Sequence, residues 1–391
     1  MSEVGPDPAD TVRIALTEAV AASRAPVPAT DAEGLVFRQL YEPLVDLDCD
    51  GAPRAALAVA WRPDAEGRRW TFSLRAGAAF WDGTPLDADA LLAGWQGSDS
   101  TVVLEGVRAD ERTITVYLTE PRPVEFFARP ALRVVKRIRE SPWPVGTGPW
   151  WLGGADTSAV MLVAQPTGLR GRARPLAFAL RPGADARDLF DAGADLVVTR
   201  DSRARTYVDG RAGWVVAELP WDRTYVLASP ALGDGTSADF TPEFRAGLAR
   251  DVVPGDARAA TGSGAVACDR LGTELPDRPL QRRLVYPRHD AAARALAERL
   301  VARADLELST IFAPPRLRGG LVAAGLPQAD FDAARAAGMD LGYVYPTLGE
   351  GAPPCVTPLV QTRPLAFVRE GSARVVRDAT GVRILPDGPW R

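Results

Sequence analysis

Histidine, lysine and cysteine are nearly absent from this chain of 391 residues. It holds one histidine, His289, and one lysine, Lys136, among 46 basic residues. A single imidazole excludes metal sites and acid–base pairs that need two histidines. A single lysine leaves one candidate for Schiff-base chemistry. We therefore expect no catalytic residue, no resident metal and no cofactor, and predict that the protein is not an enzyme.

The three cysteines, Cys49, Cys268 and Cys355, lie far apart, and none belongs to a CxxC pair. An odd number of cysteines does not form a disulfide framework, although one disulfide between two of these distant cysteines remains an alternative. No run of 18 apolar residues exists that could span a membrane. Residues 1–8 are acidic and polar and lack the features of a secretory signal. The protein is therefore cytoplasmic if Met1 is the native start, and periplasmic or extracellular and membrane-associated if a signal was removed.

Length and charge set further limits. A chain of 391 residues is too long for one core and suits two or three domains. Hydrophobic residues make up 46% and charged residues 25%, which is typical of a soluble globular protein. The net charge of −4 and the absence of long basic tracts leave no positive electrostatic field that could hold nucleic acid, which excludes a nucleic-acid-binding protein. Ten tryptophans favour stacking and packing instead.

Apolar periodicity predicts alternating strands and helices. Residues 70–75 alternate strictly and predict a half-buried strand, and Asp87 is the expected N-cap for the helix that follows. From about residue 240, helices and strands alternate in the manner of an α/β lobe with a mixed sheet. A strand is predicted to begin within 11–20, and a short helix that enters an apolar strand is predicted over 31–47. Strands are also predicted near 113–118, 159–164, 176–180, 195–198, 214–219, 223–228, 283–286 and 306–310, and helices near 184–192, 241–250 and 290–304.

Several stretches, in order along the chain, carry a resemblance to a known family. The longest is residues 57–86, LAVAWRPDAEGRRWTFSLRAGAAFWDGTPL. The turn Gly146-Thr147-Gly148-Pro149-Trp150 matches a later signature. Residues 40–47 (LYEPLVDL) and 113–121 (TITVYLTEP) also match, and weaker matches are 189–195 (LFDAGAD) and 356–361 (VTPLVQ). Together they resemble the extracellular solute-binding proteins of family 5, the peptide- and nickel-binding components of ABC importers.

The resemblance implies an α/β, two-lobed periplasmic-binding-protein-like fold of type II, similar to cluster C, with mixed β-sheets and a hinge. The resemblance also implies three parts: a discontinuous lobe I, a small subdomain packed on lobe I, and a lobe II. The expected boundaries are 11–38, 146–228 and 364–391 for lobe I, 39–145 for the small subdomain, and 229–363 for lobe II.

The implied function is that of the substrate-binding protein of an ABC importer. Such a protein captures a small polar or peptide-like solute in an interlobe cleft by hinge closure, and delivers it to an ABC permease in the membrane. We expect a monomer. Two alternatives stay open: an intracellular sensor or regulatory module with the same fold, or an enzyme built on this scaffold.

One departure from the family bears on the ligand. Peptide-binding members carry an aspartate that pairs with the amino terminus of the ligand, and Pro346 stands at the matching place here. Simple capture of a peptide amine is therefore in question. His289 as the one histidine also weakens direct histidine ligation of nickel, whereas a metal held by a small-molecule chelator stays possible.

The candidate ligand-binding residues are aromatic or cationic. On one strand, Trp221, Arg223 and Tyr225 share a face, and Arg223 could pair with a ligand carboxylate. The alternative is a solvated arginine between two structural aromatic residues. The full set of expected ligand-binding residues is Trp81, Trp221, Arg223, Tyr225, Tyr343 and Tyr345.

The glycines of the GTGP turn have a different expected role. Gly146 and Gly148 are predicted to serve backbone geometry. The turn lacks the GxxxxGK[ST] pattern, which excludes a nucleotide P-loop.

Overall fold

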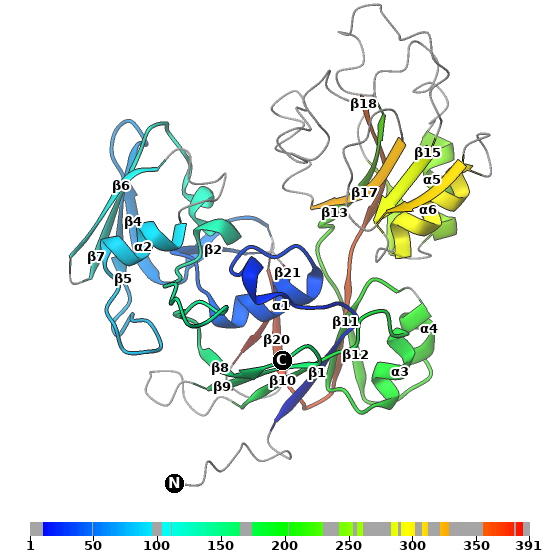
Figure 1. The fold of residues 1–391 in the computed structure, drawn as a ribbon, viewed down its shortest axis with the longest axis horizontal. Coiled ribbons are helices and arrows are strands. Elements are labelled where there is room, and N and C mark those ends of the chain that lie inside the picture. Colours follow the sequence, from blue (N-terminus) through cyan, green and yellow to red (C-terminus); the bar gives the residue numbers. More distant parts are fainter. Residues whose placement is uncertain are drawn as a thin grey trace, which may run out of the picture. The chain divides into compact units, whose positions relative to one another are not determined.

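The computed structural model divides the chain into two compact units (Figure 1). Unit 1 comprises Met1–Thr199, Arg203–Pro220 and Leu365–Arg391, and unit 2 comprises Arg200–Ser202 and Trp221–Pro364. The residues that the structure describes are 11–48, 50–95, 104–110, 112–164, 174–201, 203–229, 242–252, 256–260, 283–287, 291–301, 307–311, 321–327, 355–378 and 381–385.

The boundary after Pro220 differs from the one expected from the sequence, which placed residues 221–228 in lobe I. The strand that begins at Arg223 pairs on both sides with strands of unit 2. Its hydrogen-bonding partners therefore assign it to the second unit, and the division falls between Pro220 and Trp221.

Unit 1 contains a seven-stranded mixed sheet of β1 (Val12–Leu16), β8 (Trp150–Ala155), β9 (Ala159–Ala164), β10 (Leu176–Leu180), β11 (Leu196–Thr199), β12 (Trp214–Glu218) and β19 (Leu365–Arg369). Their order is β12-β19-β11-β1-β10-β9-β8. Strand β1 pairs in parallel with β10 and β11, and the other neighbours are antiparallel. Strand β19 comes from the end of the chain and lies between β11 and β12.

Hydrophobic clusters cover both faces of this sheet. Ile14 belongs to a cluster with helix α1 and a C-terminal hairpin, whereas its neighbour Ala15 belongs to a cluster with helices α3 and α4. Neighbouring residues of a strand point to opposite faces, so unit 1 is built in three layers. The covering elements are α1 (Asp31–Leu40), α3 (Ala186–Asp191), α4 (Arg203–Val208) and the hairpin β20–β21 (Arg374–Asp378 and Gly381–Leu385).

Helix α1 has a clear start in the sequence Thr-Asp-Ala-Glu. Thr30 is the N-cap, and its hydroxyl accepts the amide of Glu33 at 3.2 Å. The carboxylate of Glu33 is fully buried and accepts the Arg24 Nε at 2.8 Å and the Ala29 amide at 2.8 Å. These bonds fix the first turn of the helix against the chain that precedes it.

A second part of unit 1 has its own core, which draws all its buried members from residues 44–145. Its four-stranded antiparallel sheet has the order β4-β5-β7-β6, with helix α2 against one face (Figure 1). The Asp87 carboxylate accepts the Ala90 amide at 2.7 Å, which confirms the predicted cap. The elements are β2 (Val45–Leu47), β3 (Pro53–Ala55), β4 (Ala58–Pro63), β5 (Arg69–Leu74), α2 (Ala88–Trp95), β6 (Leu104–Asp110) and β7 (Thr113–Leu118).

The GTGP turn lies against the end of helix α1. The Gly148 amide donates to the Leu40 carbonyl at 2.9 Å, and the Trp81 amide donates to the Gly146 carbonyl at 2.9 Å. A Cβ on Gly146 would meet the Leu40 carbonyl oxygen, and one on Gly148 would meet the Gln39 carbonyl oxygen. Both glycines are therefore required by a close backbone approach, as the sequence predicts.

A substitution tests this packing. We expect Gly148→Ala to lower the free energy of unfolding by about 3 kcal/mol, because the methyl group meets backbone that cannot move aside. Gly154→Ala is the matched control, since its Cβ would meet nothing within 4 Å. Chemical denaturation of both variants measures the difference, and equal stabilities would contradict the close approach.

Four buried charged side chains and the half-buried Arg383 lie together in unit 1. Arg38 donates to both carboxylate oxygens of Asp378, at 2.7 Å through Nη1, and Arg383 pairs with Asp46. Arg133 is 4% exposed, and its Nη1 has no hydrogen-bond partner among the described residues. Burial lowers the pKa of Arg133 to about 9, with a further lowering by the charge of Arg38. The cluster therefore has one guanidinium more than its carboxylates balance.

Because of this excess positive charge, we expect Arg38 and Arg133 to contribute differently to stability. We expect Arg38→Met to cost about 3 kcal/mol of stability, because it removes the guanidinium that pairs with the buried carboxylate of Asp378. Arg133→Met, by the same reasoning, leaves stability unchanged or raises it, since it removes an unbalanced buried charge. Urea unfolding of the two variants measures this, and a large loss in Arg133→Met would show that its guanidinium is compensated.

Unit 2 contains a six-stranded mixed sheet in the order β14-β18-β13-β17-β15-β16. Helices α5 and α6 pack on one side of it (Figure 1), and their core includes Leu248, Leu296 and Tyr225. The elements are β13 (Arg223–Ser229), α5 (Pro242–Val252), β14 (Ala257–Ala259), β15 (Arg283–Pro287), α6 (Ala291–Val301), β16 (Glu307–Ile311), β17 (Leu321–Pro327) and β18 (Cys355–Thr362).

Candidate ligand-binding site

Two arginines lie over the ring of Trp221, where the chain enters unit 2. The guanidinium carbon of Arg258 is 4.4 Å from the ring centroid, and that of Arg363 is 4.7 Å from it. A cation over an indole face is attracted by the electrons of the ring. We call Trp221, Arg258 and Arg363 the Trp221 platform. It combines a half-buried aromatic surface with two positive charges.

The sheet register holds Arg258 in place. Strand β18 lies between β14 and β13, so Arg258, Gln361 and Thr224 form one row across three strands. The Arg258 Nε donates to the Gln361 Oε1 at 2.8 Å, and the Gln361 Nε2 donates to the Thr224 hydroxyl at 3.5 Å. Gln361 and Thr224 are buried, whereas Arg258 is exposed. A buried polar pair therefore orients an accessible guanidinium.

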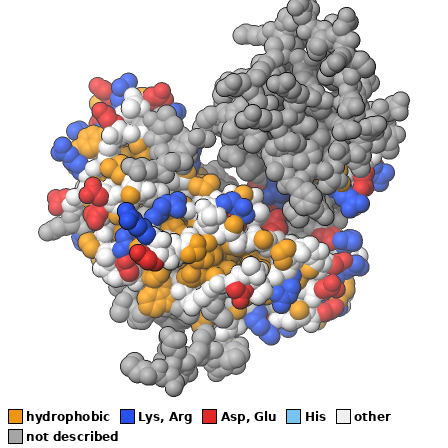
Figure 2. Space-filling view, in the orientation of Figure 1, with side chains coloured by type: hydrophobic (Ala, Val, Ile, Leu, Met, Phe, Trp, Pro, Cys, Tyr) orange, Lys and Arg blue, Asp and Glu red, His pale blue; other side chains and the backbone are white. Residues whose placement is uncertain are grey.

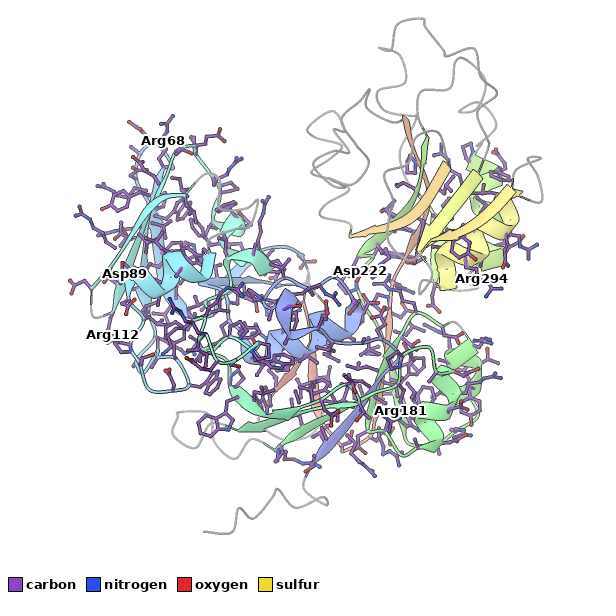
Figure 3. All side chains as sticks on the ribbon, viewed as in Figure 1. Arg68, Asp89, Arg112, Arg181, Asp222 and Arg294 are labelled. Atoms are coloured by element: carbon purple, nitrogen blue, oxygen red, sulfur yellow. The ribbon has the colours of Figure 1, made fainter. Side chains whose placement is uncertain are left out.

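Carboxylates accompany the other arginines of this region. Arg200 donates to the Asp222 Oδ2 at 2.8 Å and to the Thr362 hydroxyl at 3.2 Å (Asp222 is labelled in Figure 3). The Arg363 Nε lies 4.0 Å from an oxygen of the buried Asp256. These two guanidinium groups are thus partly neutralised by carboxylates of the same unit.

Arg258 differs from its neighbours in its charge balance. No carboxylate of the described residues lies within ion-pair distance of it, and its hydrogen bond goes to a neutral amide. Burial lowers the pKa of Arg258, and the nearby charge of Arg363 lowers it further. An anionic ligand group next to Arg258 would stabilise its charged form and so offset both effects on its pKa. The platform is therefore suited to a carboxylate whose apolar part rests on the indole ring.

The structure separates the three residues that strand alternation grouped together. Trp221 precedes strand β13 and lies outside its ladder, and Arg223 is the half-buried first residue of that strand. Tyr225 is fully buried in the hydrophobic core of unit 2 and packs there with the residues of α5 and α6. In this structure Tyr225 offers no surface to a solute, because its face of the sheet is covered by helices.

The remaining expected site residues lie elsewhere. Trp81 is half-buried, packs against the core of residues 44–145, and meets the Trp151 ring edge-on at 5.9 Å between centroids. Its indole nitrogen has no hydrogen-bond partner among the described residues. Tyr343 and Tyr345 lie outside the described residues, as does the position of Pro346.

The sequence reasoning missed Arg258, Arg363 and Gln361. No local pattern marks them, because arginine is the common basic residue throughout this chain. Only the pairing of β14 with β18 brings Arg258 beside Gln361. Asp222 could have been named from the sequence, because it lies between Trp221 and Arg223.

Two further findings limit the chemistry of the described residues. They contain no group of three histidine, cysteine, aspartate or glutamate side chains that could hold a metal ion. None of their helices is both long and apolar enough to cross a bilayer. His289, Cys49 and Cys268 lie outside the described part of the chain, so the disulfide question stays a prediction.

The different places of Tyr225 and Trp221 can be tested by truncation. We expect Tyr225→Ala to lower the free energy of unfolding by about 3 kcal/mol, the usual cost of removing a buried aromatic ring. Trp221→Ala costs about 1 kcal/mol, because it removes cation–π contacts at a partly exposed ring. Urea titrations of both variants provide the measurement. Similar losses in the two would contradict the assignment of Trp221 to a ligand-accessible surface.

Comparison with known proteins identifies relatives of part of the chain. The family model "Bacterial extracellular solute-binding proteins, family 5 Middle" matches residues 52–175. The nickel-binding periplasmic protein of Escherichia coli K12 is 30% identical over 135 residues, which are 29% of this chain and 26% of that protein. The periplasmic oligopeptide-binding protein OppA of the same organism is 38% identical over 66 residues, or 17% of this chain and 12% of OppA. The sequence matches thus span about a quarter of these relatives or less.

Solved structures extend the likeness along the chain. The crystal structure of NikA from Brucella suis in complex with Fe(III)-EDTA superposes with a TM-score of 0.69 at 15% identity, and covers 97% of this chain and 100% of that one. This confirms the expected fold class, that of the two-lobed periplasmic binding proteins. Residues 52–175 of the first unit thus resemble the bacterial extracellular solute-binding proteins of family 5, and the likeness of the whole chain to the solved structures is a likeness of fold.

Proposed function

We propose that this protein is the substrate-binding component of an ABC importer, and that it captures a small polar solute carrying a carboxylate. The Trp221 platform is the observation that carries the proposal. It presents an indole face and the exposed guanidinium of Arg258, which no carboxylate of the described residues neutralises. A ligand that leaves water needs such a paired charge, because an unpaired carboxylate is costly to desolvate.

The relatives support this ligand class. One relative is named for nickel and another for oligopeptides, and the Brucella structure holds iron chelated by a polycarboxylate. A peptide and a metal chelate both present carboxylates. In this chain the cargo is a carboxylate-bearing peptide or chelate, and the platform holds its acidic group.

Capture works by differential affinity rather than by a chemical step. The solute binds more tightly to the closed arrangement of the two units, and binding shifts the population toward that arrangement. The long segment of unit 2, Trp221–Pro364, follows Pro220 of unit 1 and ends at Pro364, so that a proline stands at each of its two boundaries. The protein acts as a monomer, either in the periplasm or outside the cell in association with the membrane, and its partner is an ABC permease.

A ligand screen tests the proposal. The panel holds dipeptides, longer peptides, amino acids, sugars, and nickel with and without chelators such as histidine. A ligand at 100 times its Kd stabilises the protein by about 2.7 kcal/mol, which raises Tm by a few degrees. We expect a shift with carboxylate-bearing members and none with neutral sugars. No shift across the whole panel would contradict the importer role.

Variants of the platform then locate the site. Arg258→Gln and Trp221→Ala are expected to abolish most of the Tm shift, since each removes one half of the platform. Arg294→Gln is the matched control in the same unit, because Arg294 is exposed on α6 and pairs only with Glu298 one turn away (Figure 3). A shift that survives in Arg258→Gln as fully as in Arg294→Gln would place the carboxylate elsewhere.

A further inference from the structure

The outer face of the β4-β5-β7-β6 sheet in unit 1 is polar and has a regular arrangement. Helix α2 and the small core cover the inner face, and no described element covers the outer one (Figure 1). Trp70, Phe72 and Leu74 of β5 point inward and are buried. Their neighbours point outward, so the residues on the outer face follow directly from strand alternation and register.

One row of the outer face crosses all four strands. The register pairs Arg62 with Thr71, Thr71 with Thr115, and Thr115 with Arg108. Two hydroxyl groups therefore lie in the middle, with a guanidinium on each side. Strands lie about 4.8 Å apart, so the row spans roughly 14 Å from β4 to β6.

The adjoining row adds an aromatic ring and a third cation. Arg69 pairs with Tyr117, and Tyr117 pairs with Gly106, which leaves space beside the ring. The Arg108 guanidinium lies 5.8 Å from the centroid of the Tyr117 ring. The two rows thus combine three guanidinium groups with hydroxyl groups and one exposed ring edge.

The β4, β5 and β7 members of these rows line an open recess of about 450 Å³, and Arg108 of β6 lies on the same face beside it. Its lining includes Arg62, Arg69, Thr71, Thr115 and Tyr117. The volume lies within the range of small-molecule sites. Figure 2 shows charged side chains, basic ones among them, along the margin of unit 1 where this sheet lies.

The polar groups of the recess are not used within the described structure. Among the described residues, the Thr71, Thr115 and Tyr117 hydroxyls have no hydrogen-bond partner, and Arg62 and Arg69 have no carboxylate within ion-pair distance. Asp64, also in the lining, is occupied by the hairpin turn, where its Oδ1 accepts the Arg68 amide at 3.0 Å and the Arg69 amide at 3.1 Å. The recess therefore has a surplus of donors and of positive charge.

We propose that this recess binds an anionic saccharide, at a site separate from the Trp221 platform. Guanidinium groups pair with the acidic groups of such a ligand, and threonine and tyrosine hydroxyls exchange hydrogen bonds with its hydroxyls. The Tyr117 ring offers an apolar edge to a sugar face. Arg62 lies in the recess and Arg108 lies beside it at the other end of the row, so the face suits a short oligomer that extends past the recess rather than a single ion.

Other partners fit the recess less well. A protein interface needs apolar or aromatic anchors at its centre, and the centre of this face consists of threonines. A nucleic acid needs a continuous basic field, whereas the chain carries a net charge of −4. The geometry favours a ligand that is rich in hydroxyl groups and carries a few acidic ones.

The test titrates trigalacturonic acid, a carboxylated trisaccharide, into the purified protein by isothermal calorimetry. Maltotriose is the neutral control and hexaglutamate the acidic control without sugar. We expect binding of trigalacturonic acid that weakens with added salt, and no binding of maltotriose. No heat with trigalacturonic acid, or equal affinity for hexaglutamate, would overturn the assignment to an anionic saccharide.

Substitutions locate the binding. We expect the double variant Arg62→Gln/Arg108→Gln to weaken trigalacturonic acid by at least about tenfold, and Thr71→Val/Thr115→Val to weaken it without a change in protein charge. Arg139→Gln removes an exposed arginine outside the recess and is the matched control. Trp221→Ala should leave this binding intact. Equal affinities in the Arg62→Gln/Arg108→Gln and Arg139→Gln proteins would refute the site, and far-UV circular dichroism verifies that each variant is folded.

Discussion

The close contact between the end of helix α1 and the GTGP backbone is the constraint on which unit 1 depends. Gly146 and Gly148 lie so near the carbonyls of Leu40 and Gln39 that no side chain fits between them. The same segment accepts the Trp81 amide and continues into strand β8 of the main sheet. Three parts of the unit therefore meet at a close approach between the glycine backbone, the Leu40 and Gln39 carbonyls and the Tyr41 ring. The glycine-rich turn therefore joins a helix, a small core and a sheet.

The charged groups of the protein serve two different purposes that depend on burial. In unit 1 the buried cluster around Arg38 and Asp378 ties α1 to the C-terminal hairpin, and its surplus guanidinium makes it costly. In the Trp221 platform, by contrast, Arg258 is accessible and is oriented by a neutral amide. An arginine that is oriented but not neutralised can respond to an incoming anion. The sheet register, through the row of Thr224, Gln361 and Arg258, makes this possible.

Much of the fold could be predicted because its strands are half-buried. Strand β5 alternates aromatic and polar residues, and the structure places them inside and outside as expected. Strand β17 was missed because its small residues show no alternation.

The candidate site was less predictable for a related reason. Alternation counted through Trp221 grouped it with Tyr225, but the ladder begins only at Arg223, and Tyr225 belongs to the core. The pairing of two distant strands places Arg258 and Gln361 together, and nothing local in the sequence marks that pairing.

The position of β19 has a consequence for how the chain is made. This strand lies between β11 and β12, although nearly all of unit 2 separates it from them in sequence. During synthesis the amino-terminal half emerges first, but its sheet has a gap until Leu365–Arg369 follows. The inserted unit can complete its own core earlier, since its strands are nearly continuous in the chain. The sheet of unit 1 is therefore completed only after unit 2 has been synthesised. A chain that stops before β19 lacks an interior strand, the one that joins β12 to the rest of the sheet.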